Sequence, residues 1–376
     1  MINIFKLRNI MGMLCLLMIV ACKKEDLDDT NTTITQPNLT APSNTTSVNL
    51  DPFSNAVVTF EWTPAATGNY TLPFYKVVFD KETGDFSKPI YTGVPQKVGT
   101  ESKLSLSHKE MNKIAYAAGI TELGTGKVKW QVIASNGVVS ATSGSGLIEL
   151  KRPVGFAENP ANLFITGAAT EGGNDLAKAL AFKKLSDGVF EIYTSLNAGN
   201  YKLVDKITGT PLNFVINAGV LKEGAETASP VTTKTVYRIN VDFNSSTATF
   251  TEIQAVGLWF SGFNTISSQL VYDAAGVWKV TDAQITWKTE SWGKDERYKF
   301  RVTEKAADGV VSVKNWGSST KDNVRATSST AASYYFLKPV DNTQYDYTYK
   351  FAQEGKADIE FRLYAAADYT HKVTFK

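Results

Sequence analysis

The chain has 376 residues, with 39 Lys and Arg against 37 Asp and Glu, two His and two Cys. This near-neutral balance argues against nucleic acid as a partner, because a nucleic-acid-binding protein needs a basic surface. Two cysteines supply neither a disulfide framework nor a cysteine-based metal site.

The N-terminus has the order of segments found in a secretory signal. Lys6 and Arg8 precede an apolar run over residues 10–20, which is too short to span a bilayer as a stable helix. The run ends in Ile19-Val20-Ala21-Cys22, the pattern of a bacterial lipobox, with a small residue before the cysteine to be acylated. We therefore predict a lipoprotein signal peptide over residues 1–21 and lipidation at Cys22. The alternative is an ordinary signal peptide that happens to contain a cysteine.

The segment after Cys22 is typical of a flexible tether. Lys23-Lys24 and the acidic residues after them lead into a stretch rich in Thr, Asn and Pro. Its few apolar residues cannot offset the entropy of ordering, so we expect residues 22–36 to form a flexible tether. The basic-then-acidic cluster resembles the surface-export signal of Bacteroidetes lipoproteins, which implies the outer leaflet of the outer membrane. The alternative is a solvated charged linker.

Beyond the tether, the dominant pattern is apolar alternation over strand-length segments. It is clearest in Val57–Trp62, Tyr75–Phe79 and Lys127–Val132, and turn residues such as Asn136-Gly137 separate these segments. A helix is expected from Ser107 to Ala118, because Ser107 can cap it and Glu110 lies three residues further on.

Residues 37–152 therefore predict a seven-stranded sandwich with one short helix, similar to an immunoglobulin or fibronectin type III module. Trp62 and Trp130 lie on strands among apolar neighbours, and we expect both in the core. The stretch from Pro153 to Pro160 is a candidate boundary.

The rest of the chain contains an internal repeat. Leu163-Phe164-Ile165-Thr166-Gly167 is echoed by Leu258-Trp259-Phe260-Ser261-Gly262, and Tyr201-Lys202-Leu203 by Tyr298-Lys299-Phe300. The order of matching segments is kept, so we predict two β-sandwich modules of one family, at 153–254 and 255–376. The expected fold class is all-β: three immunoglobulin- or fibronectin III-like β-sandwich modules in tandem after a lipidated flexible tether.

Sequence signatures of catalysis are missing. The two histidines, His108 and His371, stand apart, and there is no HExxH, no Gly-rich phosphate loop and no G-x-S-x-G elbow. We therefore expect no catalytic residues, no metal ligands and no cofactor.

Aromatic residues are concentrated in the last module, which holds five tryptophans where the middle module has none. Flat aromatic faces stack on sugar rings, while basic and amide side chains bond hydroxyl groups. On the strand around Tyr298, alternation places the basic residues opposite the apolar ones. We therefore predict a glycan-binding surface in which Trp287, Trp292 and Trp316 stack and Lys299, Arg301 and Asn315 donate or accept hydrogen bonds. Trp259 and Trp278 occupy positions held by Phe164 and Phe190 in the repeat, and we expect them in the core. The alternative for the other three indoles is loop packing.

The whole chain resembles the SusE/SusF family of outer-membrane starch-binding lipoproteins. The resemblance is carried by Leu39-Thr40-Ala41-Pro42, Phe60-Glu61-Trp62, the Ser107–Gly119 helix, Val128–Val132 and Leu163–Gly167. It implies a surface-exposed, non-catalytic lipoprotein whose first domain is a spacer and whose later modules bind α-glucan. It also implies a TonB-dependent transporter and that transporter's glycan-binding lipoprotein as partners. The loop after Gly167 lacks the aromatic residues that the family's second module often carries, which leaves two-site binding and starch itself open.

Two other functions remain open from the sequence. The modules could form an adhesin or assembly scaffold whose aromatic residues bind protein, since Trp, Tyr and Arg also dominate protein hot spots. A tethered hydrolase would need two carboxylates facing each other across a cleft, and the sequence points to no such pair.

Overall fold

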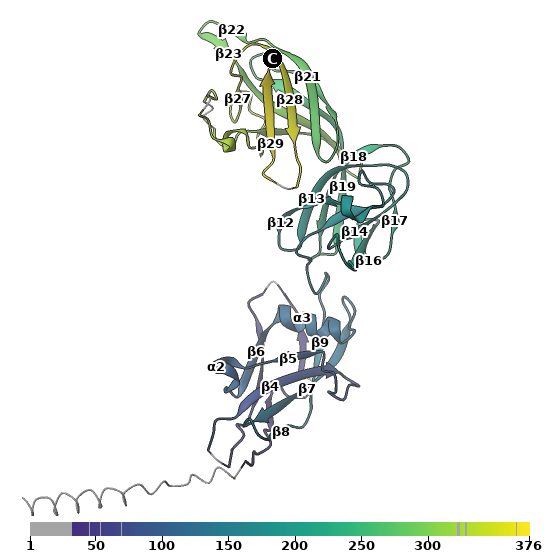
Figure 1. Ribbon diagram of the computed structural model, residues 1–376, viewed down its shortest axis with the longest axis vertical. Coiled ribbons are helices and arrows are strands. Elements are labelled where there is room, and N and C mark those ends of the chain that lie inside the picture. The colour runs from purple at the N-terminus through teal and green to yellow at the C-terminus, as the bar shows by residue number, and fades with distance from the viewer. Residues whose placement is uncertain are drawn as a thin grey trace, which may run out of the picture. The chain divides into compact units, whose positions relative to one another are not determined.

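The computed structural model describes residues 32–44, 46–52, 54–68, 70–321, 324–327, 329–365 and 367–376. The predicted signal peptide, Cys22 and most of the predicted tether lie outside these residues. The chain divides into two compact units, with unit 1 ending at Pro153 and unit 2 spanning Val154–Lys376. Both are built almost entirely of antiparallel strands, so the predicted all-β fold class is confirmed (Figure 1).

Unit 1 is a two-sheet sandwich. One sheet has the order β1-β3-β6 and the other β2-β9-β7-β4-β5, with β8 paired to β7. The described residues give nine strands where we expected seven, because short segments such as β5 and β8 carry too little alternation to be recognised. The elements are β1 (Leu39–Ala41), β2 (Thr46–Asn49), β3 (Val57–Trp62), β4 (Phe74–Lys81), β5 (Tyr91–Gly93), α2 (Gln96–Gly99), β6 (Lys103–Ser107), α3 (His108–Ala117), β7 (Thr125–Ser135), β8 (Ser140–Thr142) and β9 (Gly146–Lys151).

The helix and the core of unit 1 agree with the sequence. Ser107 Oγ accepts from Glu110 N at 3.2 Å and Glu110 Oε2 accepts from Ser107 N at 2.8 Å, which is the predicted capping box at the start of α3. Trp62 and Trp130 are buried as predicted. Phe60 packs edge-on against Trp130 at 4.9 Å between ring centroids, so aromatic contacts join the two sheets.

The folded part begins before residue 37. Ile34 forms a β-bridge with Thr67, Thr35 N donates to Ala66 O at 2.9 Å, and Gly68 N donates to Thr33 O at 2.9 Å. The predicted tether, residues 22–36, therefore extends too far, because residues 33–35 already belong to the fold. Composition did not reveal this pairing, because backbone hydrogen bonds to a neighbouring loop order polar residues as well as apolar ones.

Unit 2 is one continuous hydrogen-bonded network of strands with a separate two-stranded hairpin, β22–β23. Its elements up to β19 are β10 (Phe164–Thr166), η1 (Leu176–Lys178), β11 (Leu180–Ala181), β12 (Lys183–Ser186), β13 (Val189–Leu196), β14 (Asn200–Val204), β15 (Asn213–Asn217), β16 (Val220–Glu223), β17 (Thr227–Ala228), β18 (Thr235–Asp242) and β19 (Thr247–Phe260). The remaining elements are β20 (Thr265–Tyr272), β21 (Val277–Ile285), β22 (Lys288–Glu290), β23 (Gly293–Asp295), β24 (Arg297–Lys305), β25 (Val311–Gly317), η2 (Ala332–Tyr335), β26 (Lys338–Val340), β27 (Tyr349–Lys350), β28 (Gly355–Arg362) and β29 (Thr370–Phe375).

Strand pairing in unit 2 repeats. β10 pairs with β14, β13 with β18, and β18 with the start of β19; correspondingly, the end of β19 pairs with β24, β21 with β28, and β28 with β29. Each half also has its own buried cluster. These matching pairings support the internal repeat. The predicted module boundary at 254/255 falls inside β19, whose first part pairs with β18 and whose last part pairs with β20 and β24.

Side chains also join the two halves of unit 2. Glu171 Oε1 accepts from Ser195 N at 2.6 Å and also from the Tyr272 hydroxyl, while Glu171 Oε2 accepts from Ala275 N at 2.7 Å. Tyr369 Oη donates to Glu191 Oε1 at 2.6 Å. A shared strand and these bonds make the two halves one unit.

Candidate functional site

The hairpin β22–β23 presents the most exposed tryptophan of the chain. Its strands pair through Lys288 with Asp295 and Glu290 with Gly293, so Trp292 lies in the turn. The Trp292 side chain is 65% exposed, whereas the other six tryptophans are buried or half-buried. A large indole left in water at a hairpin turn contributes little to the fold, so its exposure favours a binding role.

Arg297, at the start of β24, is held rigidly beside this turn. Its Nε and Nη2 donate to Asp295 Oδ1 and Oδ2 at 2.8 and 2.7 Å, and Asp295 is buried. The hydrogen bonds that Arg297 donates to Asp295 raise the pKa of Arg297. Burial alone would raise the pKa of Asp295, but the bonds and charge of Arg297 outweigh burial and lower it. The pair is therefore fixed and ionised.

The guanidinium of Arg297 lies beside two exposed aromatic side chains. Its central carbon is 4.3 Å from the ring centroid of Tyr345 and 5.8 Å from that of Trp292. Tyr345 is 43% exposed. We call Trp292, Arg297 and Tyr345 the aromatic–arginine surface. Arg297 covers part of the Tyr345 ring, so the exposed indole of Trp292 is the main stacking face and Arg297 is a fixed donor beside it.

Trp287 lies next to this surface but is largely covered. Arg325 and Lys294 lie over its ring at 4.9 and 5.8 Å, and its backbone N donates to Glu354 Oε1 at 2.9 Å. Lys294 Nζ donates to Glu354 Oε2 at 2.8 Å, and this bond is the main cause of the lowered pKa of Glu354. A ligand reaching the Trp287 ring would have to displace cations already stacked there.

Three residues predicted to contact glycan are buried instead. Trp316 is 4% exposed within the core of the second half, Asn315 is buried, and Lys299 is fully buried. Asn315 and Trp316 both lie on β25. The expectation that these three are accessible is wrong.

The reason is that both faces of β24 are covered. Lys299 Nζ donates to the backbone oxygens of Thr343 and Asp346 at 2.5 and 3.3 Å, so the segment around residue 343 covers the face that alternation assigned to solvent. Burial lowers the pKa of Lys299. Arg301 stacks on Trp259 at 4.3 Å and donates from Nε to Asn315 Oδ1 at 3.2 Å. Lys299, Arg301 and Asn315 do lie together, but beneath the surface and around a buried indole.

The sequence-based choice missed Arg297 and Tyr345. Arg297 carries a sequence signal, because it lies on the same strand face as Lys299 and Arg301 and only five residues after Trp292. Tyr345 has none, since only the fold brings its loop to the start of β24. Trp259 and Trp278 are buried, as predicted for core residues.

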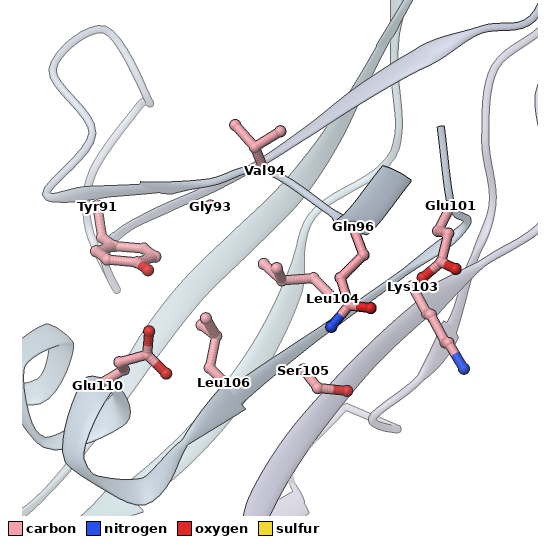
Figure 2. A pocket seen from close by; sticks show the side chains of 10 residues that line it. All are labelled: Tyr91, Gly93, Val94, Gln96, Glu101, Lys103, Leu104, Ser105, Leu106 and Glu110. Atoms are coloured by element: carbon pink, nitrogen blue, oxygen red, sulfur yellow. The ribbon is translucent and has the colours of Figure 1, made fainter. Parts of the chain in front are cut away.

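Unit 1 has a cavity of about 320 Å³ on one side of its sandwich, lined by residues of β5, β6 and α3. Figure 2 shows Tyr91 and Glu110 at one end of it and Glu101 and Lys103 at the other. Both carboxylates have structural partners: Glu110 accepts from Ser107 and Glu101 pairs with Lys97 at 3.1 Å. Burial, followed by the charge of Glu110, raises the pKa of Tyr91. These bonds favour a structural role for the two acids.

Among the residues that the structure describes, no group of three or more His, Cys, Asp or Glu side chains is arranged to hold a metal ion. No helix of the described chain is long and apolar enough to cross a bilayer.

The family model of the SusE outer membrane protein matches residues 23–133. The chain is therefore similar to this family over residues 23–133. The resemblance predicted from the Phe60–Trp62 strand, the capped helix and the Val128–Val132 strand is thereby confirmed for this region, and the match supports an outer-membrane location. No curated protein matches the chain.

Among solved structures, the crystal structure of SusF from Bacteroides thetaiotaomicron matches with 10% sequence identity. The match covers 91% of this chain and 100% of that one, with a TM-score of 0.26. A likeness this weak carries no argument about the ligand of the SusE-like chain.

Proposed function

We propose that this chain is a non-catalytic, lipid-anchored glycan-binding protein of the cell surface. In this proposal it holds polysaccharide, starch or a related glycan, for a TonB-dependent transporter and that transporter's glycan-binding lipoprotein partner. Cys22 carries the lipid, unit 1 is the spacer, and the two halves of unit 2 are two modules of one family that meet near residue 254, within β19. The SusE-like match over residues 23–133 supports the setting, and unit 2 supplies the binding surface.

The aromatic–arginine surface is the observation that supports glycan as the ligand. Trp292 and Tyr345 are exposed beside a guanidinium that Asp295 holds in place. A pyranose ring has an apolar C–H face and a rim of hydroxyl groups. The aromatic rings offer an apolar surface to the C–H face, and Arg297 offers a fixed donor to the hydroxyl groups. Because the groups are already fixed, binding costs little conformational entropy.

The exposed side chains of this surface reduce the set of glycan-binding residues that the sequence predicted. Trp292 remains in the proposal, and Trp287 contributes at its edge. Trp316, Lys299 and Asn315 are buried and leave the proposed contact set, and Arg301 stays on Trp259. The protein-binding alternative uses the same surface, since exposed Trp, Tyr and Arg also form protein hot spots.

Native affinity gels test this function. The mature chain, residues 22–376 with Cys22→Ser, is run through gels that contain starch, dextran, levan or xylan. We expect retardation in at least one gel and its loss in Trp292→Ala/Tyr345→Ala. The matched control is Tyr70→Ala, which removes a ring that is 94% exposed in unit 1. Retardation that survives the double variant would overturn the site, and no retardation in any gel would favour the protein-binding scaffold.

The anchor is tested separately. Mass spectrometry of the membrane fraction should find acyl chains on Cys22 of the natural chain. Cys22→Ser should release the protein into the soluble fraction.

A further inference from the structure

Three segments of unit 1 carry no charge. Residues 30–50, 62–75 and 130–148 contain no Lys, Arg, Asp or Glu, although one residue in five of the whole chain is charged. Loops of all three segments meet at one end of the sandwich: Thr35 N donates to Ala66 O, Asn136 Nδ2 donates to Thr32 O at 3.0 Å, and Phe74 pairs with Ser135. We call these loops the uncharged tip.

The opposite end is different. It holds α3, with Lys109, Glu110 and Lys113, and the ion pair of Lys127 with Glu82 at 3.7 Å. Figure 1 shows α3 and β8 at opposite ends of unit 1. Next to the tip, the segment 97–103 contacts Tyr75 and Trp62 and carries Lys97, Glu101 and Lys103. The absence of charge is therefore a property of the tip loops and not of the whole end.

Large apolar side chains project from the uncharged tip. Tyr70 is 94% exposed, Leu72 71% and Val138 72%. Tyr70 and Leu72 lie on the loop before β4, and Val138 lies on the turn between β7 and β8, which is adjacent because β4 pairs with β7. Exposed apolar groups gathered on neighbouring loops indicate a contact surface.

The backbone of the loop before β4 holds Tyr70 in an exposed position. Tyr70 has φ of 58°, in the left-handed region that an aromatic residue seldom adopts. The loop is fixed by bonds from Gly68 N to Thr33 O and from Tyr70 N to Thr67 O at 3.2 Å. Val98 and Leu123 have the same φ and are also exposed. The gathering of Tyr70, Leu72 and Val138 on neighbouring loops, and not backbone strain, therefore distinguishes the tip.

The uncharged tip lies close in sequence to the predicted lipid anchor, Cys22. Thr32, which contacts Asn136 of the tip, lies ten residues after Cys22. Ten residues span at most about 36 Å when extended and about 16–19 Å on average when flexible. If Cys22 carries lipid, as the proposed function requires, the tip stays within this distance of the membrane.

We propose that the uncharged tip docks on the lipid surface in which Cys22 is anchored, with Tyr70, Leu72 and Val138 inserted among the headgroups. A surface without charge needs no counter-ion there, and Tyr suits an interface that is apolar on one side and wet on the other. One anchor is then supplemented by a second, weak contact, which fixes the orientation of unit 1. The chain leaves unit 1 near α3, where Arg152 Nε donates to Asn112 Oδ1 at 2.9 Å, so docking of the tip directs that end away from the membrane.

Vesicle binding without the lipid anchor tests this inference independently of the proposed function. The mature chain with Cys22→Ser is floated with vesicles of phosphatidylethanolamine and phosphatidylglycerol at low and high salt. We expect weak binding that salt does not change, and about tenfold weaker partitioning for Tyr70→Ser/Leu72→Ser/Val138→Ser. The matched control is Val57→Ser/Leu123→Ser, which removes side chains that are 55% and 66% exposed at the α3 end of unit 1. The control should bind like the parent.

Three outcomes would overturn the proposal. They are absence of vesicle binding by the Cys22→Ser chain, equal loss in the tip and control variants, and binding that disappears at high salt. A dimer in sedimentation velocity that only the tip variant dissociates, without vesicle binding, would identify a second copy as the occupant instead. Failure of the proposed function would show elsewhere, as no acyl chain on Cys22 or no retardation by glycan.

Discussion

The two halves of unit 2 solve the same packing problem with different aromatic residues. In residues 154–254 the core contains Phe156, Phe214 and Phe243, whose rings pack at centroid distances of 4.9–5.4 Å. In residues 255–376, Trp278 and Trp316 pack edge-on against Phe361 at 5.9 and 6.0 Å. Three of the five tryptophans of the second half are buried, Trp287 is half-buried and only Trp292 is exposed. Most of the difference in indole content is therefore core composition.

The two halves show that aromatic content and aromatic exposure are separate properties. The number of aromatic residues describes how a sandwich fills its interior, whereas exposure describes what it offers to a ligand. Phe190 and Trp278, which the sequence repeat matches, are both buried, so this exchange changes the first without the second. Exposed aromatic rings beside a fixed cation, at Trp292 and Tyr345, are the feature that distinguishes the second half.

The largest effect should come from truncating the two aromatic cores. Trp316→Ala should lower the free energy of unfolding by about 3–5 kcal/mol, because it removes a fully packed ring and leaves a cavity. Phe214→Ala in the first half should cost a similar amount. Urea denaturation measures both. If Trp316→Ala kept full stability and lost retention on glycan, the ring would be a binding residue and the comparison would fail.

How far the sequence predicts this fold depends on what each segment contacts. The Ser107–Glu110 capping box, the β3 and β7 strands and the burial of Trp62 and Trp130 follow from local pattern, and all four are confirmed. Local pattern works there because the burial of each residue is decided by its own sheet. The cluster of Lys299, Arg301 and Asn315 was also predicted to lie together, and it does.

The exposure of that cluster could not be predicted from local pattern. A strand that alternates basic and apolar residues is assigned one wet face, but a distant segment around Thr343 covers this face of β24 and accepts from Lys299. The same kind of distant contact brings Tyr345 to Arg297. Neither contact has a sequence signal, because loops between strands are positioned by the completed fold.

The next largest effect should come from Glu171, which joins the halves. Its carboxylate accepts from Thr194 Oγ1, from Ser195 N and Oγ, from the Tyr272 hydroxyl and from Ala275 N. Glu171→Ala should lower the free energy of unfolding by about 2–3 kcal/mol, because several buried donors lose their acceptor. Lys178→Ala, at an exposed salt bridge in the same half, is the control and should change it by less than about 0.5 kcal/mol. Equal effects would show that the halves are not joined through Glu171.

A pH effect should follow from His371, which has no counterpart in the first half. Burial lowers the pKa of His371 to about 3, against the bond with the Tyr335 backbone. Tyr335 O can only accept, so Nδ1 at 3.0 Å carries the proton and Nε2 accepts from Tyr298 Oη at 2.8 Å. The folded state keeps the ring neutral, whereas the unfolded chain protonates it at a pKa of 6.5. The unfolded state therefore binds more protons at acid pH.

Stability should accordingly be highest above pH 6.5 and fall below it by up to about 1.4 kcal/mol per pH unit. Urea denaturation between about pH 7 and about pH 5.5 covers the range before most carboxylates titrate. His371→Gln, which cannot titrate and keeps an amide oxygen as an acceptor for Tyr298, should be less stable at pH 7 but should show a flatter dependence. An unchanged slope in this variant would assign the pH effect to other groups.

The smallest effect on stability should come from Trp292. Trp292→Phe should change the free energy of unfolding by less than about 0.5 kcal/mol, since the side chain is 65% exposed and fills no cavity. It should remove most of the tryptophan fluorescence that acrylamide quenches readily, because the other indoles are buried or half-buried. A bound glycan should protect the same fraction in the parent chain and have no protective effect in the variant. Trp287→Phe is the matched control, since this ring lies under Arg325 and Lys294 and should contribute little to that fraction. If glycan protected the fluorescence of Trp287 instead, the binding surface would lie on the covered side of the hairpin, and the cations over that ring would have to move to admit the sugar.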